Sequence, residues 1–258
     1  MSRSNLLHMN QKNTHKRLKT PIIQPKEHIY LEGPKSRGYE LWFAWRVFRQ
    51  FIRGFRSLHF MGPSVTVFGS ARFPEGHVYY EKAREFGERI AKLGLVTITG
   101  GGPGIMEAAN RGAFEAGGQS VGCNIRLPFE QKENPYLHSS ITFEHFFVRK
   151  VLLVKYSYAF VIMPGGFGTM DELFETLTLV QTKTITKFPI VLFGKQYYQP
   201  LMDTIKEMEK QGTISPEDLS LVKFTDNVEE AMEFIASYIK KHYKVKPRKR
   251  LWWLFEKR

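Results

Sequence analysis

Short apolar runs alternate with longer stretches of helical periodicity from residue 64 onward. The runs are rich in β-branched and aromatic residues and predict strands at 64–70, 95–100, 119–125, 141–146, 159–165, 188–194 and a weaker 219–224. The stretches between most of them predict helices at 77–93, 104–117, 147–157, 169–182, 197–211 and 227–242. Buried strands that alternate with helices are typical of parallel, doubly wound sheets. The sequence therefore predicts a single α/β domain with a Rossmann-like sheet.

A further, amphipathic helix is predicted before the first strand, within 39–60. Its arginines follow one another at three or four residues, which places them on one face, and apolar side chains fall on the opposite face. The basic positions are Arg46, Arg49, Arg53 and Arg56, and the apolar ones are Phe48, Phe51, Ile52 and Phe55. The apolar face can pack on the domain or lie on an anionic membrane. Packing is the favoured interpretation, because most such faces belong to a core.

The positive charge of the chain is concentrated at its two ends. The net charge is +13, yet residues 61–239 carry 17 Lys and Arg against 21 Asp and Glu. A nucleic-acid-binding domain would normally carry the basic patch on its body. We therefore predict a basic arm at 1–37, the enzyme domain with its preceding helix at 38–243, and a basic, aromatic tail at 244–258. Contact of the ends with membrane or nucleic acid stays open.

Cysteine and histidine usage predicts neither a disulfide nor a metal site. Cys123 is the only cysteine and lies in a predicted buried strand, where it is expected to belong to the core. The histidines show no metal-binding spacing, and His138 and His145 are expected to be surface or loop groups. No secretory signal is apparent, and no apolar run reaches the roughly 20 residues that span a bilayer. These features predict a cytoplasmic protein without a metal.

Three loops are predicted at the carboxyl edge of the sheet, where open α/β folds bind ligands. They are FGSAR (68–72, with Ser70), GGGPG (100–104) and PGGFGT (164–169). Glycine lets the backbone approach a ligand closely, and a following helix N-terminus offers free N–H groups to a phosphate. Neither the GxGxxG dinucleotide pattern nor the GxxxxGK[ST] P-loop is present. The loops therefore indicate a mononucleotide.

Charged residues accompany two of these loops. Glu172 either closes a capping box that starts at Thr169 or faces the sugar, where a carboxylate can stabilise an oxocarbenium-like transition state. Glu107 either binds ribose hydroxyls or is a first-turn acid favoured by the helix dipole. Arg149 and Lys150 stand at a predicted helix start, which that dipole disfavours. An anionic ligand or a carboxylate partner would explain them.

These motifs resemble the signature of the Lonely Guy (LOG) phosphoribohydrolases, also described as lysine decarboxylase-like proteins. The similarity spans roughly residues 40–240 and is carried by GGGPGIMEAANRGA (100–113), RK (149–150) and PGGFGTMDELFE (164–175). The further segments VTVFGSARF (65–73) and LPFEQKENPY (127–136), with the helix before the first strand, point to the longer bacterial branch.

The resemblance implies hydrolysis of nucleoside 5′-monophosphates, such as AMP or cytokinin riboside monophosphates, without metal or cofactor. It implies that Arg149 and Glu172 are catalytic and that Lys150 and Ser70 stand beside them at the substrate. The 5′-phosphate would lie on Gly165, Gly166, Phe167, Gly168 and Thr169, with Gly101, Gly102, Gly104 and Glu107 near the sugar and base. It also implies a homodimer or larger homo-oligomer.

Two other functions stay open at this point. A protein of the same fold can bind a nucleotide or the molybdenum cofactor without catalysis, although a carrier has no need of the arginine–glutamate pair. A lysine decarboxylase would need a lysine that binds pyridoxal phosphate, and no lysine here is singled out for that role.

Overall fold

The structure is a computed structural model that describes residues 33–127, 132–185, 188–220 and 222–243. Seven parallel strands form one sheet in the order β4-β3-β2-β1-β5-β6-β7. They are β1 (Ser64–Phe68), β2 (Val96–Thr99), β3 (Ser120–Ile125), β4 (Ser139–Phe143), β5 (Ser157–Ile162), β6 (Ile190–Phe193) and β7 (Val222–Thr225). The predicted Rossmann-like α/β fold is confirmed, and each predicted strand is present with shifted ends.

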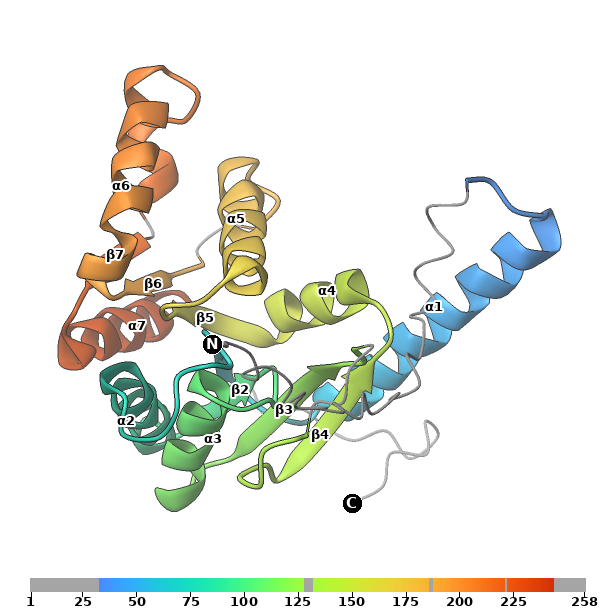
Figure 1. Cartoon of the computed structure of the whole chain (residues 1–258), viewed down its shortest axis with the longest axis horizontal. Helices are drawn as coiled ribbons and strands as arrows, with labels where there is room; N and C mark the ends of the chain where they lie inside the picture. The colour runs from blue at the N-terminus through green and yellow to red at the C-terminus, as the bar shows by residue number, and fades with distance from the viewer. Residues whose placement is uncertain (1–32, 128–131, 186–187, 221, 244–258) are drawn as a thin grey trace, which may run out of the picture.

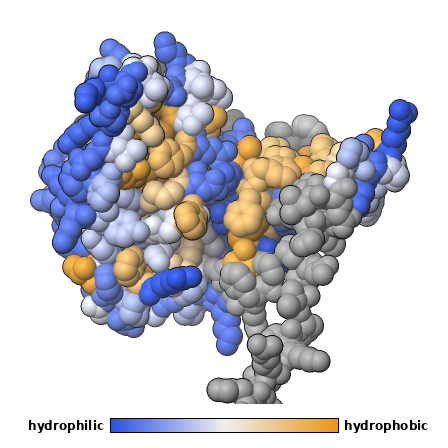
Figure 2. Space-filling view, turned by 45° about the horizontal axis from the view of Figure 1, so that its top comes forward, coloured by the Kyte–Doolittle hydropathy of each residue, from blue (hydrophilic) through white to orange (hydrophobic). Residues whose placement is uncertain are grey.

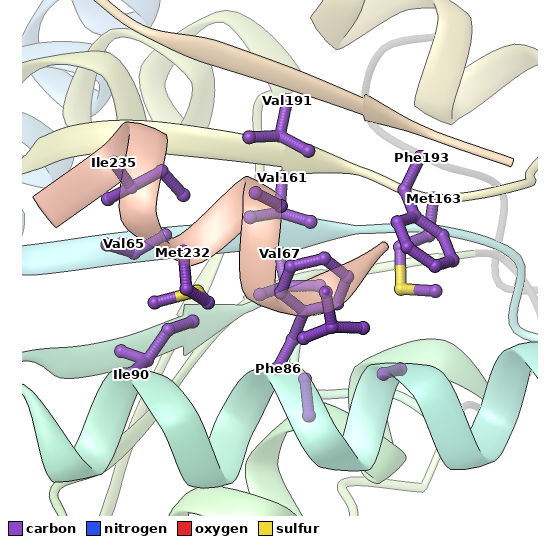
Figure 3. Close-up of a cluster of buried hydrophobic side chains, with 14 of the residues drawn as sticks. Val65, Val67, Phe86, Ile90, Val161, Met163, Val191, Phe193, Met232 and Ile235 are labelled. Carbon is purple, nitrogen blue, oxygen red and sulfur yellow. The ribbon is translucent and has the colours of Figure 1, made fainter. Parts of the chain in front are cut away.

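Helices cover both faces of the sheet (Figure 1). The helices α2 (Val78–Lys92), α3 (Ile105–Glu115) and α7 (Val228–His242) enclose one core. The helices α1 (Arg37–Leu58), α4 (Phe146–Tyr156), α5 (Phe167–Gln181) and α6 (Lys195–Lys210) enclose the other, which also holds Cys123 as predicted. Figure 3 shows the first core, where Phe86 and Ile90 of α2 and Met232 and Ile235 of α7 pack on valines of the central strands. The central strands are buried from both sides, which explains why their sequences read as continuous apolar runs.

The order in which strands are added to the sheet changes direction at β1. Strands β2, β3 and β4 are added on one side of β1, and β5, β6 and β7 on the other. The loops that follow β1 and β5 therefore leave the same edge in opposite directions. They are joined where Ser70 donates its backbone N–H to the carbonyl of Pro164 at 3.0 Å. This position is the topological switch point at which open α/β sheets bind their ligands.

Helices α2 and α3 approach each other through two glycines. A Cβ at Gly87 would lie 1.9 Å from the carbonyl oxygen of Ala109, and one at Gly112 would lie 1.9 Å from that of Arg84. Backbone atoms cannot yield as a flexible side chain does, so any side chain at either position forces the helices apart. The two glycines thereby determine how closely α3, and the loop before it, lie on the sheet.

The amphipathic helix before the first strand is present as α1, and it packs against α4 and β4. Gly54 and Leu58 are buried there, and Phe51 and Phe55 are partly buried. The expectation that the whole apolar face docks is wrong in part, since Phe48 and Ile52 remain 52% and 41% exposed. Figure 1 shows in addition that the N-terminal part of α1 extends beyond the domain.

Most of the predicted basic arm, 1–37, and the whole predicted tail, 244–258, lie outside the described residues. The domain boundaries at 38 and 243 therefore stay predictions. Among the described helices, none is both long and apolar enough to traverse a bilayer.

Replacing Gly87 or Gly112 by alanine should each lower the free energy of unfolding by about 1–3 kcal/mol, because the added methyl group meets backbone atoms. Gly38→Ala in α1 is the matched control, since a Cβ there meets nothing within 4 Å. It should leave stability unchanged or raise it slightly through better helix propensity. Urea unfolding followed by circular dichroism measures all three, and equal effects at the three positions would contradict the packing argument.

Candidate functional site

A cavity of about 630 Å³ opens at the switch point, within the usual size range of small-molecule sites. The loop after β1 and the start of α5 form its opposite walls, and residues from α3, α4 and the end of β3 complete it. Of the residues predicted for the site, it brings together Ser70, Arg149, Gly165, Gly166, Phe167, Gly168 and Thr169. The two loops joined by the Ser70–Pro164 hydrogen bond thus meet in one cavity, as predicted from their place after parallel strands.

The N-terminus of α5 points its backbone amides into this region. The helix begins at Phe167, with Gly166 as N-cap and no side chain capping it. The N–H groups of Phe167 and Gly168 make no hydrogen bond within the part of the chain that the structure describes. Gly165 has no room for a side chain, because a Cβ would lie 2.2 Å from Oγ1 of Thr169. Free amides and the positive end of the helix dipole make this an anion site.

The predicted capping box at Thr169 is wrong. Because α5 begins two residues before Thr169, Thr169 and Glu172 both lie inside the helix. Both are buried, and Glu172 is 1% exposed. A capping carboxylate would sit at the third helical position and bond the N-cap amide. Glu172 therefore does not cap α5, and its burial needs another explanation.

That explanation is the ion pair between α4 and α5. Nη2 of Arg149 donates to Oε1 of Glu172 at 3.1 Å, with the arginine side chain 12% and the glutamate side chain 1% exposed. Arg149 lines the cavity and lies over the ring of Phe146, 5.2 Å from its centroid, whereas Glu172 is not among the residues that line the cavity. Nε of Arg149 is buried and has no partner among the described residues. A buried donor without a partner is costly, so the guanidinium still has a hydrogen bond to offer a ligand.

The carboxyl group of Glu172 has a raised pKa. Burial disfavours its charged form and is the largest cause; Arg149 and then Lys150 act in the opposite direction, and the charge of Glu175 adds to the increase. A raised pKa means that the native state binds this proton more tightly than the unfolded chain does. The group therefore contributes stability at low pH that is lost as pH rises through its native pKa. Buried carboxyls with such shifts concentrate at functional sites.

Lys150 does not reach the cavity. Its Nζ lies 2.8 Å from Oδ1 of Asp171 and 2.9 Å from Oε2 of Glu175, both on α5. Burial alone would lower the pKa of Lys150, but these two carboxylates raise it above its ordinary value. Arg149 and Lys150 therefore each have a carboxylate partner, which was one of the two explanations predicted for them. Lys150 acts as a second tie between α4 and α5 and keeps Arg149 beside Glu172.

The GGGPG loop lies next to the cavity but contributes Gly100 to its wall instead of the predicted Gly101, Gly102 and Gly104. Gly101 donates its N–H to Oγ1 of Thr99, and Asn134 hydrogen-bonds to the carbonyls of Gly101 and Gly102. A Cβ at Gly104 would lie 2.5 Å from the carbonyl oxygen of Ser70. These three glycines hold the loop against its neighbours, a role that their spacing alone does not reveal.

Glu107 is the third residue of α3 and does not line the cavity. It accepts a hydrogen bond from the hydroxyl group of Tyr80 at 3.2 Å. Its first-turn position agrees with the helix-dipole interpretation of this residue. The contact with ribose stays a prediction that this position does not favour.

The lining residues that were not predicted for the site include Arg72, Met106, Phe146 and Tyr197. The signal for Arg72 was present, since it stands two residues after Ser70 in a ligand-edge loop. Tyr197 comes from α6, more than 20 residues after the last predicted site residue, and donates its hydroxyl hydrogen to the carbonyl of Gly165 at 2.8 Å. Among the described residues the cavity is lined by two arginines and no acid, so its charge suits an anion.

No cluster of potential metal ligands is found among the described residues. His145 lies in the loop between β4 and α4, as predicted, but it is not a surface group. It is the N-cap of α4, 1% exposed, and its ring packs between Phe43 and Phe147.

Fold and site together define a Rossmann-like α/β protein with a cationic, glycine-walled cavity at the switch point. The model of a family described as "Possible lysine decarboxylase" matches residues 106–235. A cytokinin riboside 5′-monophosphate phosphoribohydrolase from Rhodococcoides fascians is 32% identical over 180 residues, which cover 67% of this chain and 89% of that protein. One from Arabidopsis thaliana is 27% identical over 175 residues, 66% of this chain and 81% of that protein. The chain belongs to this family, the LOG phosphoribohydrolases, as its motifs predicted.

Solved structures share the fold. The molybdenum-cofactor carrier protein of Chlamydomonas reinhardtii superposes with a TM-score of 0.53 at 26% identity, covering 70% of this chain and 99% of that one. The molybdenum-cofactor-binding protein of Rippkaea orientalis superposes with a TM-score of 0.51 at 23% identity, covering 69% of this chain. The second likeness concerns the fold alone.

The electrostatics of the ion pair predict how Glu172 titrates. Its carboxyl should titrate above the ordinary range of glutamate, and Glu175→Gln should lower its pKa, because a neighbouring negative charge is removed and Lys150 loses a competing partner. Titration of ¹³C-labelled glutamate side chains by NMR measures both values, with Glu172→Gln used for assignment. Glu207→Gln on the exposed face of α6 is the control and should leave the titration unchanged. An unchanged or higher pKa in Glu175→Gln would contradict this account.

Proposed function

We propose that the protein hydrolyses the N-glycosidic bond of nucleoside 5′-monophosphates, AMP or cytokinin riboside monophosphates among them. Water adds its hydroxyl group to C1′ of the ribose, the C1′–N bond breaks, and the proton goes to the leaving base, so that free base and ribose 5-phosphate result. The single observation that carries this proposal is the buried Arg149–Glu172 pair beside free amides of α5. The family relatives are named for the same reaction class.

In this proposal the 5′-phosphate binds at the start of α5. The amides of Phe167 and Gly168, with Gly165, Gly166 and Thr169 forming the turn, surround the phosphate oxygens, and the helix dipole favours their charge. Ser70 and Arg72 approach from the opposite wall. A phosphate anchored there directs the ribose toward Arg149, which lines the same cavity.

Arg149 and Glu172 carry out the chemistry in this proposal. Glycosidic cleavage develops positive charge at C1′, which a carboxylate stabilises directly or through a water molecule that it activates. Because Arg149 lines the cavity and Glu172 does not, the guanidinium must move for the carboxylate to reach the substrate. One hydrogen bond to Glu172 and a partnerless Nε permit that movement. The charges needed come from protein side chains, so the proposal includes no metal or cofactor.

We also propose that the protein acts as a homodimer or larger homo-oligomer. Five large apolar side chains are exposed on α4 and α5, and Phe146 and Phe167 among them line the cavity: Phe146, Phe147, Val151, Phe167 and Phe174. Such a cluster next to a ligand site is typical of a protein–protein interface. A second copy that covers it would exclude water from the cavity mouth. A reducing, cytoplasmic location agrees with the single buried cysteine.

A carrier function is the second candidate, because a molybdenum-cofactor carrier protein is among the similar solved structures. The buried catalytic-type pair favours the hydrolase. Incubation with AMP separates the two: release of adenine and ribose 5-phosphate supports the hydrolase, and tight binding without turnover supports the carrier.

Glu172→Gln should reduce the rate of adenine release from AMP about 10²- to 10⁴-fold, the usual contribution of a positioned acid–base group. Thermal stability should change little, because glutamine still accepts the hydrogen bond of Arg149 and the buried charge is removed. Glu207→Gln on exposed α6 should retain full activity. Chromatographic assay of free adenine measures the rate, and full activity of Glu172→Gln would return this residue to a purely structural role.

Val151→Asp should lower the mass of the assembly in solution, because a charge in a buried apolar interface is unfavourable. Val78→Asp is the matched control, since Val78 is 61% exposed on α2, on the other face of the sheet. Size-exclusion chromatography with light scattering measures the mass. A monomeric wild type, or equal effects of the two substitutions, would refute the proposed interface.

A further inference from the structure

Along most of its length, α1 presents a face of mixed chemistry that the other described residues leave largely exposed. Its exposed apolar side chains are Leu41, Trp42, Trp45, Phe48 and Ile52, and its arginines are Arg46, Arg49, Arg53 and Arg56. We call these nine residues the α1 face. In Figure 2 the arm at the right carries hydrophobic side chains in orange beside hydrophilic ones. The face is separate from the apolar cluster on α4 and α5 that adjoins the cavity.

The two kinds of side chain form neighbouring stripes along the helix. Leu41, Trp45, Phe48 and Ile52 follow at intervals of four, three and four residues, and the arginines follow at three, four and three. The rings of Trp45 and Phe48 stack with centroids 5.4 Å apart, so the apolar stripe is continuous. Between α1 and the edge of the sheet the face borders a hollow of about 700 Å³, which Arg126 also lines. The result is an apolar stripe flanked by cations.

The charges of the α1 face lack partners of opposite sign. Arg49, Arg53 and Arg56 form no ion pair with the residues that the structure describes. Glu144 at the border of the hollow already pairs with Arg126 at 3.2 Å. A ligand of this face must therefore carry negative charge for the arginines and an apolar region for the apolar stripe.

This requirement separates the candidate occupants. Two copies that met symmetrically through this face would bring eight of these arginines together, which is repulsive. The two ends of this chain are basic as well: residues 1–32 carry 6 Lys and Arg against 2 Asp and Glu, and residues 244–258 carry 7 against 1. RNA would satisfy the arginines and stack on the tryptophans, but the aliphatic Leu41 and Ile52 have no use in stacking. An anionic bilayer satisfies both stripes at once.

We propose that the α1 face binds the surface of membranes that contain anionic phospholipid. The helix lies in the interface, with its apolar stripe at the boundary between head groups and acyl chains and its arginines at the lipid phosphates. Because α1 packs on α4 and the sheet through other side chains, among them Phe43, Gly54 and Leu58, it presents this face without any change in the domain. The inference is independent of the proposed hydrolase activity.

The test uses the full chain carrying Trp252→Phe and Trp253→Phe. Trp42 and Trp45 are then the only tryptophans, so the emission reports on the α1 face alone. Addition of phosphatidylcholine vesicles that contain phosphatidylglycerol should shift the emission to shorter wavelength, and added salt should weaken the effect. Vesicles of phosphatidylcholine alone should cause little shift. No shift with the anionic vesicles overturns the proposal.

A charge-matched pair of triple variants identifies the segment that binds. Arg49→Gln, Arg53→Gln and Arg56→Gln together should weaken co-sedimentation with the anionic vesicles about 100-fold, as expected for three basic residues at a membrane surface. Arg248→Gln, Lys249→Gln and Arg250→Gln remove the same charge from the C-terminal segment and should weaken it much less. Circular dichroism confirms that each variant is folded. Equal losses overturn the proposal, since binding would then follow net charge.

Two further outcomes overturn it as well. If Trp45→Ser dissociates an assembly seen by light scattering, the face is an interface between copies of this chain. If a single-stranded RNA binds with the same arginine dependence and the vesicles cause no emission shift, the ligand is nucleic acid.

Discussion

The site depends on how closely three backbone segments approach one another at the carboxyl edge of the sheet. The loop after β1 is bonded on one side to Pro164, before α5, and on the other to the first residue of α3, since Ile105 donates its N–H to the carbonyl of Ser70 at 3.0 Å. Gly104 and Gly165 make this approach possible, because a Cβ at Gly104 would lie 2.5 Å from the carbonyl oxygen of Ser70 and one at Gly165 would lie 3.1 Å from the backbone nitrogen of Ser70. These contacts fix the positions of the two cavity walls relative to each other.

The ion pair between Arg149 and Glu172 beside this cavity is buried, and its burial is energetically unfavourable. Removal of two charges from water is unfavourable, and a single hydrogen bond between Arg149 and Glu172 offsets it only in part, as the raised pKa of the carboxyl shows. A hydrophobic pair would serve stability better. Lys150, held between Asp171 and Glu175, supports the arrangement from the solvent side. The protein therefore keeps a locally unfavourable ion pair beside its cavity, as expected at a functional site.

Two clusters of exposed apolar side chains among the described residues differ in their chemistry. On α4 and α5 the exposed phenylalanines adjoin the cavity and suit a second copy of the chain. On α1 a stripe of exposed apolar side chains runs beside a stripe of arginines, which suits an anionic interface.

The sequence by itself determined the strand and helix order, the parallel sheet, the family and the three loops of the ligand edge. It could do so because buried strands, helical periodicity and glycine-rich turns are local patterns. Tertiary structure alone decided the features that depend on residues distant in the chain. It decided where α5 begins, and it decided that Gly101 and Gly102 accept hydrogen bonds from Asn134. It also decided that the hydroxyl group of Tyr197 bonds to Gly165. It also decided that Phe48 and Ile52 stay exposed, because periodicity defines the faces of a helix but not how much of its length finds a partner.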